Sequence, residues 1–379
     1  MPSLAWRWTL PLLALYLGVV LSRYPILVAS PRLWAEEGSK YFQAAYNTGF
    51  SAVLSVGQGY YSVVPSLATW LATLVALSYA PVVTLVISAL LQTAPALLVL
   101  RSRSAVLPLW GRMVILGALV FSPQAVGEIW LNTVNSQVFL AVAAFLVLLE
   151  PKLRPAHLGW LALAVFTAPT AVFLGPLFGL RALRQRSRDA WIGFGVVALA
   201  GLVDVLALVG RPPSGDGVGI GATLAAWLRT IVAEGFVAGV PETAQAVIGV
   251  AVLAVLTGIF VASADTGAWV LALGAGVVSV LNAEFALMGK VADRYAFAPV
   301  LMVVIALVVA AGSARVWTRV PVAAVLVTVL FGGILGYAAQ SPSVDSRWPS
   351  WRDQVESGAT EIRLWPNRSI FVVHLRPRS

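Results

Sequence analysis

"HLGWLALAVFTAPTAVFLGPLFGL", residues 157–180, is the apolar run that decides how this chain crosses a membrane. Basic residues lie on both sides of it: Lys152 and Arg154 precede it, and "RALRQRSR" (181–188) follows it. A straight helix of this length would place the two basic segments on opposite sides of a bilayer. A bend at the central Pro169 into two short helices would bring both to the same side, because proline interrupts a helix. The bend agrees with the tendency of Lys and Arg to stay in the cytoplasm.

The whole chain has the composition of a helical membrane protein. Of its 379 residues, 59% are hydrophobic and only 11% are charged. A transmembrane β-barrel would show short alternating segments, whereas this chain has continuous Leu, Val and Ala runs. We therefore expect an all-α polytopic membrane protein with about 11 transmembrane helices, two of them short and paired at Pro169. The first run, 8–29, follows Arg7 without a signal-peptide cleavage site, so we expect an uncleaved anchor.

A second segment, "SVVPSLATWLATLVALSY" (62–79), is expected to lie along the outer surface instead of crossing. With this placement and the bend at Pro169, every basic linker faces the cytoplasm, as the positive-inside rule requires. The N-terminus is then cytoplasmic, and two large outer loops lie at 30–80 and 210–245. The apolar runs are 8–29, 62–79, 81–100, 112–122, 135–149, 158–180, 190–209, 246–262, 268–284, 297–312 and 320–339.

The expected organisation is one membrane domain with a small cap. Residues 1–340 would form the transmembrane domain, and the tail at 341–379 would be an extracytoplasmic cap that is too short for a core of its own. The net charge of +9 reflects orientation in an anionic bilayer, and no stretch resembles a nucleic-acid-binding patch. The Ala-, Val- and Arg-rich composition favours a bacterial plasma membrane.

The absence of cysteine excludes disulfides, thiolate metal sites and cysteine nucleophiles. The two histidines, His157 and His374, are far apart in sequence, which argues against a histidine-based metal centre. Carboxylates therefore become the candidates for chemistry. Glu36 and Glu37 stand side by side in "PRLWAEEGSKYFQAAYNTGF" (31–50), directly after the first apolar run.

The order of paired acids in a first outer loop, surface helices and a bent helix pair resembles the GT-C superfamily of integral-membrane glycosyltransferases. The stretch "AEEGSKYF" is similar to the Asp-Glu motif of the protein O-mannosyltransferase and aminoarabinose transferase families, and to a Glu-Asp-Gly version in uncharacterised bacterial membrane proteins. The resemblance implies a catalytic general base, Glu36 or Glu37, that deprotonates an acceptor hydroxyl. It also implies a polyprenyl-phosphate-linked sugar donor, an envelope glycan, lipid or protein acceptor, and inversion at the sugar carbon. The alternative is that Glu36 forms a solvated i,i+4 pair with Lys40.

Two further polar stretches are candidate substrate-binding segments. In "SPQAVGEIWLNTVNSQVF" a helix would align Glu128, Asn132 and Asn135 on one face, where they would bind sugar hydroxyls or help to hold a divalent cation. The alternative is that Asn and Ser cap the next helix. In "NAEFALMGKVADRYAFAPV" the choice for the donor phosphate is Arg294, then Lys290, beside Tyr295. No cofactor is predicted beyond such a cation.

Two other functions stay open at this point. A transporter or flippase of lipid-linked glycan should carry interrupted helices in repeat-related halves, with polar residues near the middle of the membrane. This chain instead gathers its carboxylates in outer loops, which favours chemistry at the membrane surface. A non-catalytic membrane assembly subunit with the same fold is the third possibility.

Overall fold

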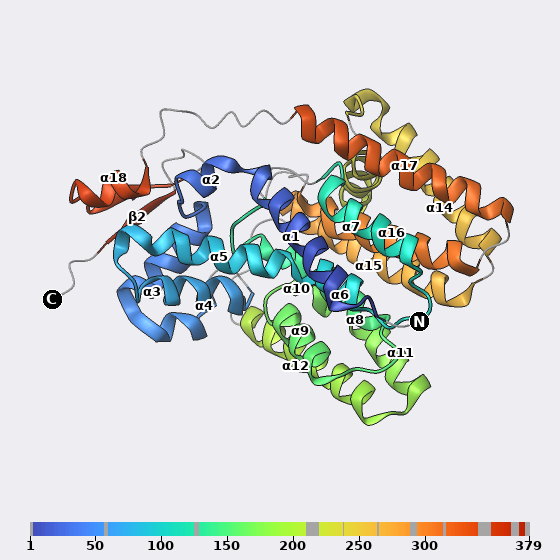
Figure 1. The fold of residues 1–379 in the computed structure, drawn as a ribbon, viewed down its shortest axis with the longest axis horizontal. Coiled ribbons are helices and arrows are strands. Elements are labelled where there is room, and N and C mark those ends of the chain that lie inside the picture. The colour runs from blue at the N-terminus through green and yellow to red at the C-terminus, as the bar shows by residue number, and fades with distance from the viewer. Residues whose placement is uncertain are drawn as a thin grey trace.

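The computed structural model shows a mostly helical protein (Figure 1). It describes residues 3–56, 60–124, 129–209, 220–237, 239–263, 265–288, 294–313, 316–339, 350–364 and 371–375. Among these residues, 5 helical stretches are long and apolar enough to cross a membrane, and several apolar helices are shorter. This content agrees with an all-α membrane protein. The 5 stretches are Leu77–Arg101, Arg188–Ala207, Glu242–Ser263, Arg294–Gly312 and Arg319–Tyr337.

The segment after the first long helix is a set of short helices. One of them, α4 (Val63–Ala72), has 10 residues and is therefore about 15 Å long. It is too short to cross the roughly 30 Å of a hydrocarbon core by itself. The first long helix is α1 (Trp6–Arg23). The helices that follow it are α2 (Pro25–Ala29), η1 (Glu37–Phe42), α3 (Gln43–Thr48), η2 (Gly49–Leu54), α4 and η3 (Leu77–Tyr79).

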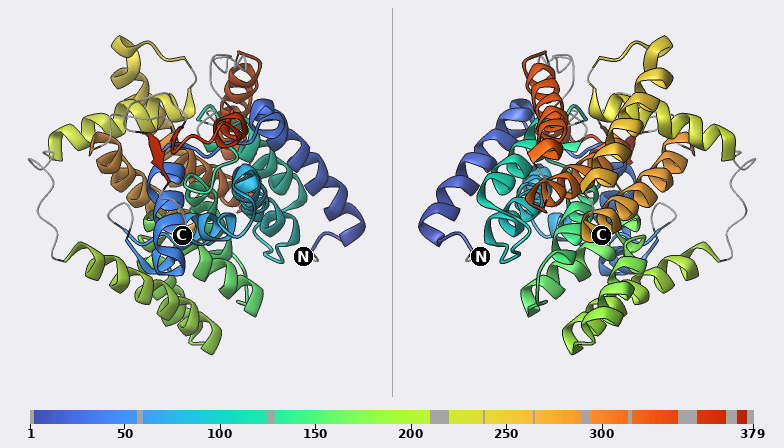
Figure 2. Two further views of the ribbon diagram at one scale, coloured as in Figure 1. Left: turned by 90° about the vertical axis from the view of Figure 1, so that its left-hand side faces the viewer. Right: turned by 90° about the vertical axis from the view of Figure 1, so that its right-hand side faces the viewer.

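The centre of the assembly is α16 (Arg294–Ser313), whose apolar residues are almost all buried. It packs against α15 (Thr266–Met288), α7 (Leu109–Phe121) and α8 (Ser136–Leu148). Viewed along the long axis, α1 in dark blue and α12 in yellow-green lie on the outside (Figure 2). The other helices are α5 (Ala80–Gln92), α6 (Ala94–Arg101), α13 (Ile220–Ala226), η5 (Trp227–Glu234), η6 (Glu242–Ala244), α14 (Gln245–Ser263) and α17 (Val316–Ala339).

The apolar run around Pro169 consists of separate helices. The first, α9 (Pro155–Val165), ends before the proline, and α10 (Pro169–Val172), α11 (Gly175–Gln185) and α12 (Arg188–Leu208) follow. The interruption leaves two carbonyl groups without helical partners, and the first loop satisfies them. Val63 N donates to Phe166 O at 2.9 Å, and Ser62 Oγ donates to Thr167 O at 3.0 Å. The broken run is thus attached to the start of α4.

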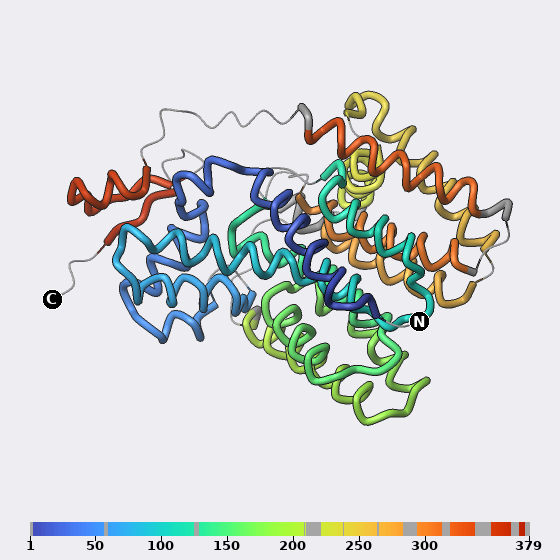
Figure 3. The backbone as a smooth tube through the Cα atoms, in the orientation of Figure 1, coloured from blue at the N-terminus to red at the C-terminus, as the bar shows by residue number. Residues whose placement is uncertain are grey.

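The basic linkers gather at one end of the molecule. Leu4 N donates to Leu100 O at 3.3 Å, which joins the N-terminus to the end of α6. Leu153 N donates to Asp189 Oδ2 at 2.8 Å, so the linkers before α9 and after α11 meet. In the backbone trace the chain begins at this end, and α17 runs back from it towards the opposite end (Figure 3).

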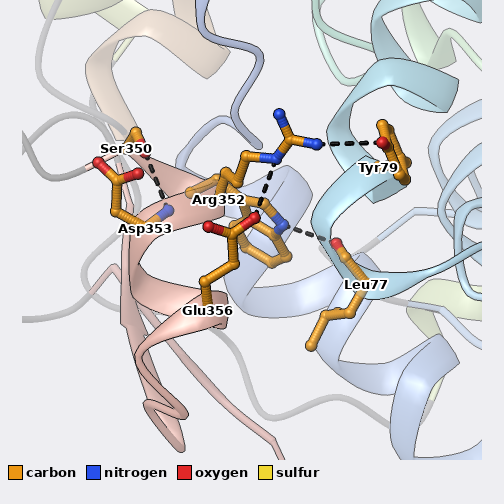
Figure 4. Close-up of polar contacts among 7 residues, drawn as sticks. Leu77, Tyr79, Ser350, Arg352, Asp353 and Glu356 are labelled. Carbon is orange, nitrogen blue, oxygen red and sulfur yellow. Dashed lines mark hydrogen bonds and ion pairs between the residues drawn. The ribbon is translucent and has the colours of Figure 1, made fainter.

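The C-terminal tail packs on the first loop at that opposite end. It contains α18 (Trp351–Glu356) and an antiparallel pair, β1 (Glu361–Arg363) and β2 (Val372–His374). Trp351 is buried beside Phe42. Its indole nitrogen donates to Leu77 O at 2.8 Å, one of the contacts between α18 and η3 in Figure 4. A Cβ atom at Gly38 would collide with the side chain of Leu364, so this glycine permits the close approach of Leu364, the residue after β1, to η1.

Candidate functional site

The two adjacent acids of the first loop have different environments. Glu37 is 1% exposed, and its carboxylate accepts hydrogen bonds from Trp34 N at 3.1 Å, Thr133 N at 2.8 Å and Thr133 Oγ1 at 2.5 Å. Burial raises the pKa of Glu37, although these hydrogen bonds act in the opposite direction. The contacts join the first loop to the segment before α8, so Glu37 has a structural role.

A tight turn presents Thr133 to Glu37. Leu131 has φ 56°, in the left-handed region that a helix does not tolerate. Asn132 stabilises the turn: its Oδ1 accepts from Asn135 N at 2.8 Å, and its Nδ2 donates to Trp130 O at 3.3 Å. The helix α8 begins only after this turn, at Ser136.

The predicted polar stripe of Glu128, Asn132 and Asn135 is therefore wrong as a helical face. The described part of this stretch, 129–135, is not α-helical, and Asn132 and Asn135 are buried. The Asn132 side chain bonds to the nearby backbone and so competes with a helix at this point. This is close to the capping alternative, except that the asparagine stabilises a turn before α8. Glu128 lies outside the described residues.

Glu36 is the acid that remains available. It is half-buried, and its carboxylate accepts no hydrogen bond from any residue that the structure describes. It lies within electrostatic range of two tyrosines, Tyr41 and Tyr60. Burial raises the pKa of each hydroxyl, and the negative charge of Glu36 raises it further. Both tyrosines therefore stay protonated at neutral pH and can donate hydrogen bonds near Glu36.

Tyr60 connects Glu36 to the start of α16. Its pKa is raised by burial first, then by Tyr295 and Glu36, while the positive charge of Arg294 lowers it. Its hydroxyl donates to Gln137 Oε1, on the first turn of α8, at 3.2 Å. The Arg294 guanidinium lies 5.2 Å from the centroid of the Tyr295 ring. The predicted residues Glu36, Arg294 and Tyr295 thus share one neighbourhood, whereas Lys290 lies outside the described residues.

The loop carrying Tyr60 is fixed on its other side by an acid in α12. Tyr61 N donates to Asp204 Oδ1 at 3.2 Å, and the Tyr61 hydroxyl donates to Val53 O at 3.1 Å. Ser62 and Val63 add their hydrogen bonds to the carbonyl groups that follow α9. Together these contacts fix the position of the loop that carries Tyr60.

Metal ligands are sparse in the described part of the chain. No group of three or more His, Asp or Glu side chains forms there. Glu36 is the described carboxylate that would be placed to contact a divalent cation beside Tyr60. Glu37 is already saturated with hydrogen bonds.

The residues that sequence reasoning missed are Thr133, Tyr60 and Gln137. Each lies inside a stretch that was singled out or next to one, but neutral polar side chains carry no periodic signal. An Asn-Thr pair before a long apolar helix does indicate a capping turn, and this signal points to Thr133. Nothing local to Tyr60 or Gln137 predicts their contact, since they are 77 positions apart.

In comparisons with known proteins, no protein-family model, curated protein or solved structure matches the chain.

Proposed function

We propose that this protein is a membrane glycosyltransferase that moves a sugar from a polyprenyl-phosphate donor to an envelope acceptor, with inversion at the sugar carbon. The observation that carries the proposal is the convergence of Glu36 and Arg294 on Tyr60. Glu36, whose carboxylate accepts no hydrogen bond from the described residues, and the Arg294 guanidinium both lie within electrostatic range of the Tyr60 hydroxyl, so a base and an anion-binding group share one neighbourhood. The superfamily resemblance of the stretch around Glu36 supports the same assignment.

The proposed reaction is a direct displacement. The Glu36 carboxylate takes the proton of an acceptor hydroxyl, and the acceptor oxygen attacks the anomeric carbon from the side opposite the phosphate. The bond between that carbon and the phosphate oxygen breaks, and its electron pair leaves on the polyprenyl phosphate. Arg294 neutralises the phosphate charge through its planar donor fork, and Tyr295 supports the guanidinium face. Tyr60, held by Gln137, positions the bound groups between the two.

The proposed orientation places this site outside the cytoplasm of a bacterium, in the plasma membrane. The gathering of the basic linkers at the other end of the molecule supports it, because Lys and Arg are retained on the cytoplasmic side. The N-terminus is then cytoplasmic, and the transmembrane domain 1–340 carries an extracytoplasmic cap, 341–379. In this proposal α4 is the surface helix of the GT-C arrangement, and α9 and α11, joined through the short α10, are its bent pair.

The test is transfer by purified protein in liposomes, with a radiolabelled polyprenyl-phosphate sugar and an extract of envelope acceptors. Glu36→Gln should lower the transfer rate at least about 10²-fold, the scale of a lost general base, and leave the melting temperature unchanged. Glu242→Gln, an exposed acid in η6, is the matched control and should keep full activity. Full transfer by Glu36→Gln would overturn the proposal. Movement of intact donor across the bilayer without transfer would favour the flippase.

Arg294 gives a second arm of the same assay. Arg294→Ala should weaken donor binding more than Arg294→Lys, because lysine keeps the charge and loses the fork. The readout is the donor concentration at half-maximal rate. Equal activity of both variants with the wild type would place the phosphate elsewhere and leave the base assignment standing.

A further inference from the structure

A buried glutamine of α5, Gln92, contacts the turn before α8 through both ends of its side-chain amide. Its Nε2 donates to Ile129 O at 3.0 Å, and its Oε1 accepts from Leu131 N at 3.2 Å. The side chain is fully buried and belongs to an apolar stretch that is long enough to cross a membrane, Leu77–Arg101. An amide in such surroundings costs free energy unless its polar ends are bonded, as they are here.

These two hydrogen bonds hold a backbone conformation that is unfavourable by itself. Leu131 has φ 56°, and a residue with a side chain keeps this left-handed conformation where surrounding contacts fix it. Gln92 bonds to the backbone on both sides of Trp130, as a neighbouring strand would. Gln92 is itself held, because the Tyr16 hydroxyl of α1 donates to its carbonyl oxygen at 3.0 Å. The turn is thus tied to two helices.

The same turn leads directly to the acid pair of the first loop. Two residues after Leu131, the backbone nitrogen of Thr133 donates to Glu37 Oε1 at 2.8 Å. A change of the Thr133 side chain leaves this donor in place, whereas a shift of the turn would move it. Because Glu36 and Glu37 are adjacent in the chain, a displacement of Glu37 also displaces Glu36.

We propose that Gln92 is a positioning residue, which acts through the turn and Glu37 to hold Glu36 within reach of the acceptor hydroxyl. This role rests on the proposed function, in which Glu36 is the general base. A general base must lie within hydrogen-bond reach of the proton that it removes, and a small misplacement lowers the rate. The donor phosphate is assigned to Arg294, on another helix. Loss of Gln92 should therefore lower kcat and leave the donor KM unchanged.

Gln92→Met tests the proposal, because methionine is unbranched, fills irregular space and makes neither hydrogen bond. In the full-length protein in detergent, hydrogen–deuterium exchange of the backbone amides at 131–133 should become about tenfold faster, the scale of one or two lost hydrogen bonds. Exchange in α16 should not change, which would show that the rest of the fold is intact. In the liposome transfer assay kcat should fall about tenfold, and the donor KM should stay within about twofold of the wild type.

A second variant and a matched control accompany this substitution. If Gln92→Met melts early, Tyr16→Phe replaces it, since it removes only the hydroxyl donor to Gln92 O and should give smaller changes of the same kind. Ser88→Ala is the control: Ser88 is buried one turn earlier on α5, and its hydroxyl donates to Leu85 O of the same helix at 2.9 Å. It should change neither exchange at 131–133 nor kcat.

The outcomes separate the positioning role from the proposed function. Unchanged exchange at 131–133 in Gln92→Met would overturn the link between Gln92 and the turn. Faster exchange with an unchanged kcat would overturn the positioning role and leave Gln92 a purely structural residue. A wild type that transfers no sugar would overturn the proposed function instead, and the exchange measurement would still decide whether Gln92 fixes the turn.

Discussion

Two buried carboxylates at opposite ends of the protein hold neighbouring segments together in the same way. Glu37 accepts from the hydroxyl and the backbone nitrogen of Thr133, and Glu150 accepts from Ser102 Oγ at 2.5 Å and from Arg103 N at 3.3 Å. Their exposed fractions are 1% and 5%. The difference lies in the charges around them, since Arg112 and Arg181 lie within electrostatic range of Glu150. Within the described residues, no basic side chain compensates the charge of Glu37 in this way.

The same criteria separate the roles of Glu36 and Glu37, the acid pair of the first loop. An acid that is buried and saturated with donors is a structural anchor, whether it lies at the basic end or beside the proposed site. Glu37 meets this description as fully as Glu150 does. Glu36, half-buried and near Tyr60, does not. Of two adjacent acids in one motif, Glu37 fixes the loop, and Glu36 is the one that the proposed reaction uses.

The largest effect is expected in thiol labelling, which tests whether the two ends of the protein lie on opposite sides of the membrane. The chain has no cysteine, so single thiols can be compared cleanly at two exposed alanines, Ala76 before η3 and Ala156 in the first turn of α9. Ala76→Cys should react with a membrane-impermeant maleimide on intact cells. Ala156→Cys should react only after permeabilisation. The same pattern at both positions would remove the basis for comparing two ends.

The second effect concerns the stability contributed by each anchor. Glu37→Gln should cost about 1–3 kcal/mol of unfolding free energy, because the amide leaves one of its donors without an acceptor. Glu150→Gln should cost more, since it also leaves Arg112 and Arg181 without their shared negative charge. Denaturant titration in detergent measures both variants, with Glu242→Gln as the control. A larger loss for Glu37→Gln would contradict the comparison.

A third effect is the pH dependence of stability that Glu37 should cause. Its pKa in the folded protein is raised above the usual 4.5. The fold therefore disfavours the ionised form, and the stability linked to this group is present below pH 4.5 and is lost as the pH rises through the raised pKa. The free energy of wild type minus that of Glu37→Gln should fall across this window. A difference that grows with pH would show that the donors outweigh burial.

The smallest effect is the loss of one hydroxyl donor at each anchor. Thr133→Val and Ser102→Ala each remove a hydrogen bond to a carboxylate and keep the backbone donors, so each should cost about 1 kcal/mol. Thermal melting in detergent should detect both shifts. Transfer activity per folded molecule should survive both substitutions. Loss of activity in Thr133→Val without loss of stability would instead give Glu37 a part in the chemistry.

Sequence alone could indicate the elements whose causes are local. Proline disfavours a helix interior, and the run around Pro169 is broken in the structure, although Pro11, Pro299 and Pro321 lie within continuous helices. The segment 62–79 contains a helix of only 10 residues, α4, which is shorter than a membrane span, and its placement along the outer surface stays a prediction. Helical content and membrane character follow from composition for the same reason.

The other features of the site depend on tertiary contacts, which the spacing of residues in the sequence does not show. Residue spacing places Asn132 and Asn135 on one helical face, but the Asn132 side chain bonds to the backbone of a turn, and α8 begins only after both residues, at Ser136. The grouping of Glu36, Tyr60 and Arg294 requires the first loop to fold back onto α8 and α16. The choice between Glu36 and Glu37 also required the position of Thr133, which the motif itself does not contain.

The contact between Gly38 and Leu364 sets an order of events during biogenesis. The ribosome makes the first loop before the tail, and yet Leu364 and β2 of the tail pack on η1, the helix that contains Glu37. Until synthesis ends, Leu33 and Phe42 lack the Trp351 and Leu364 side chains that bury them. A chain without the tail would keep this apolar surface of the first loop uncovered.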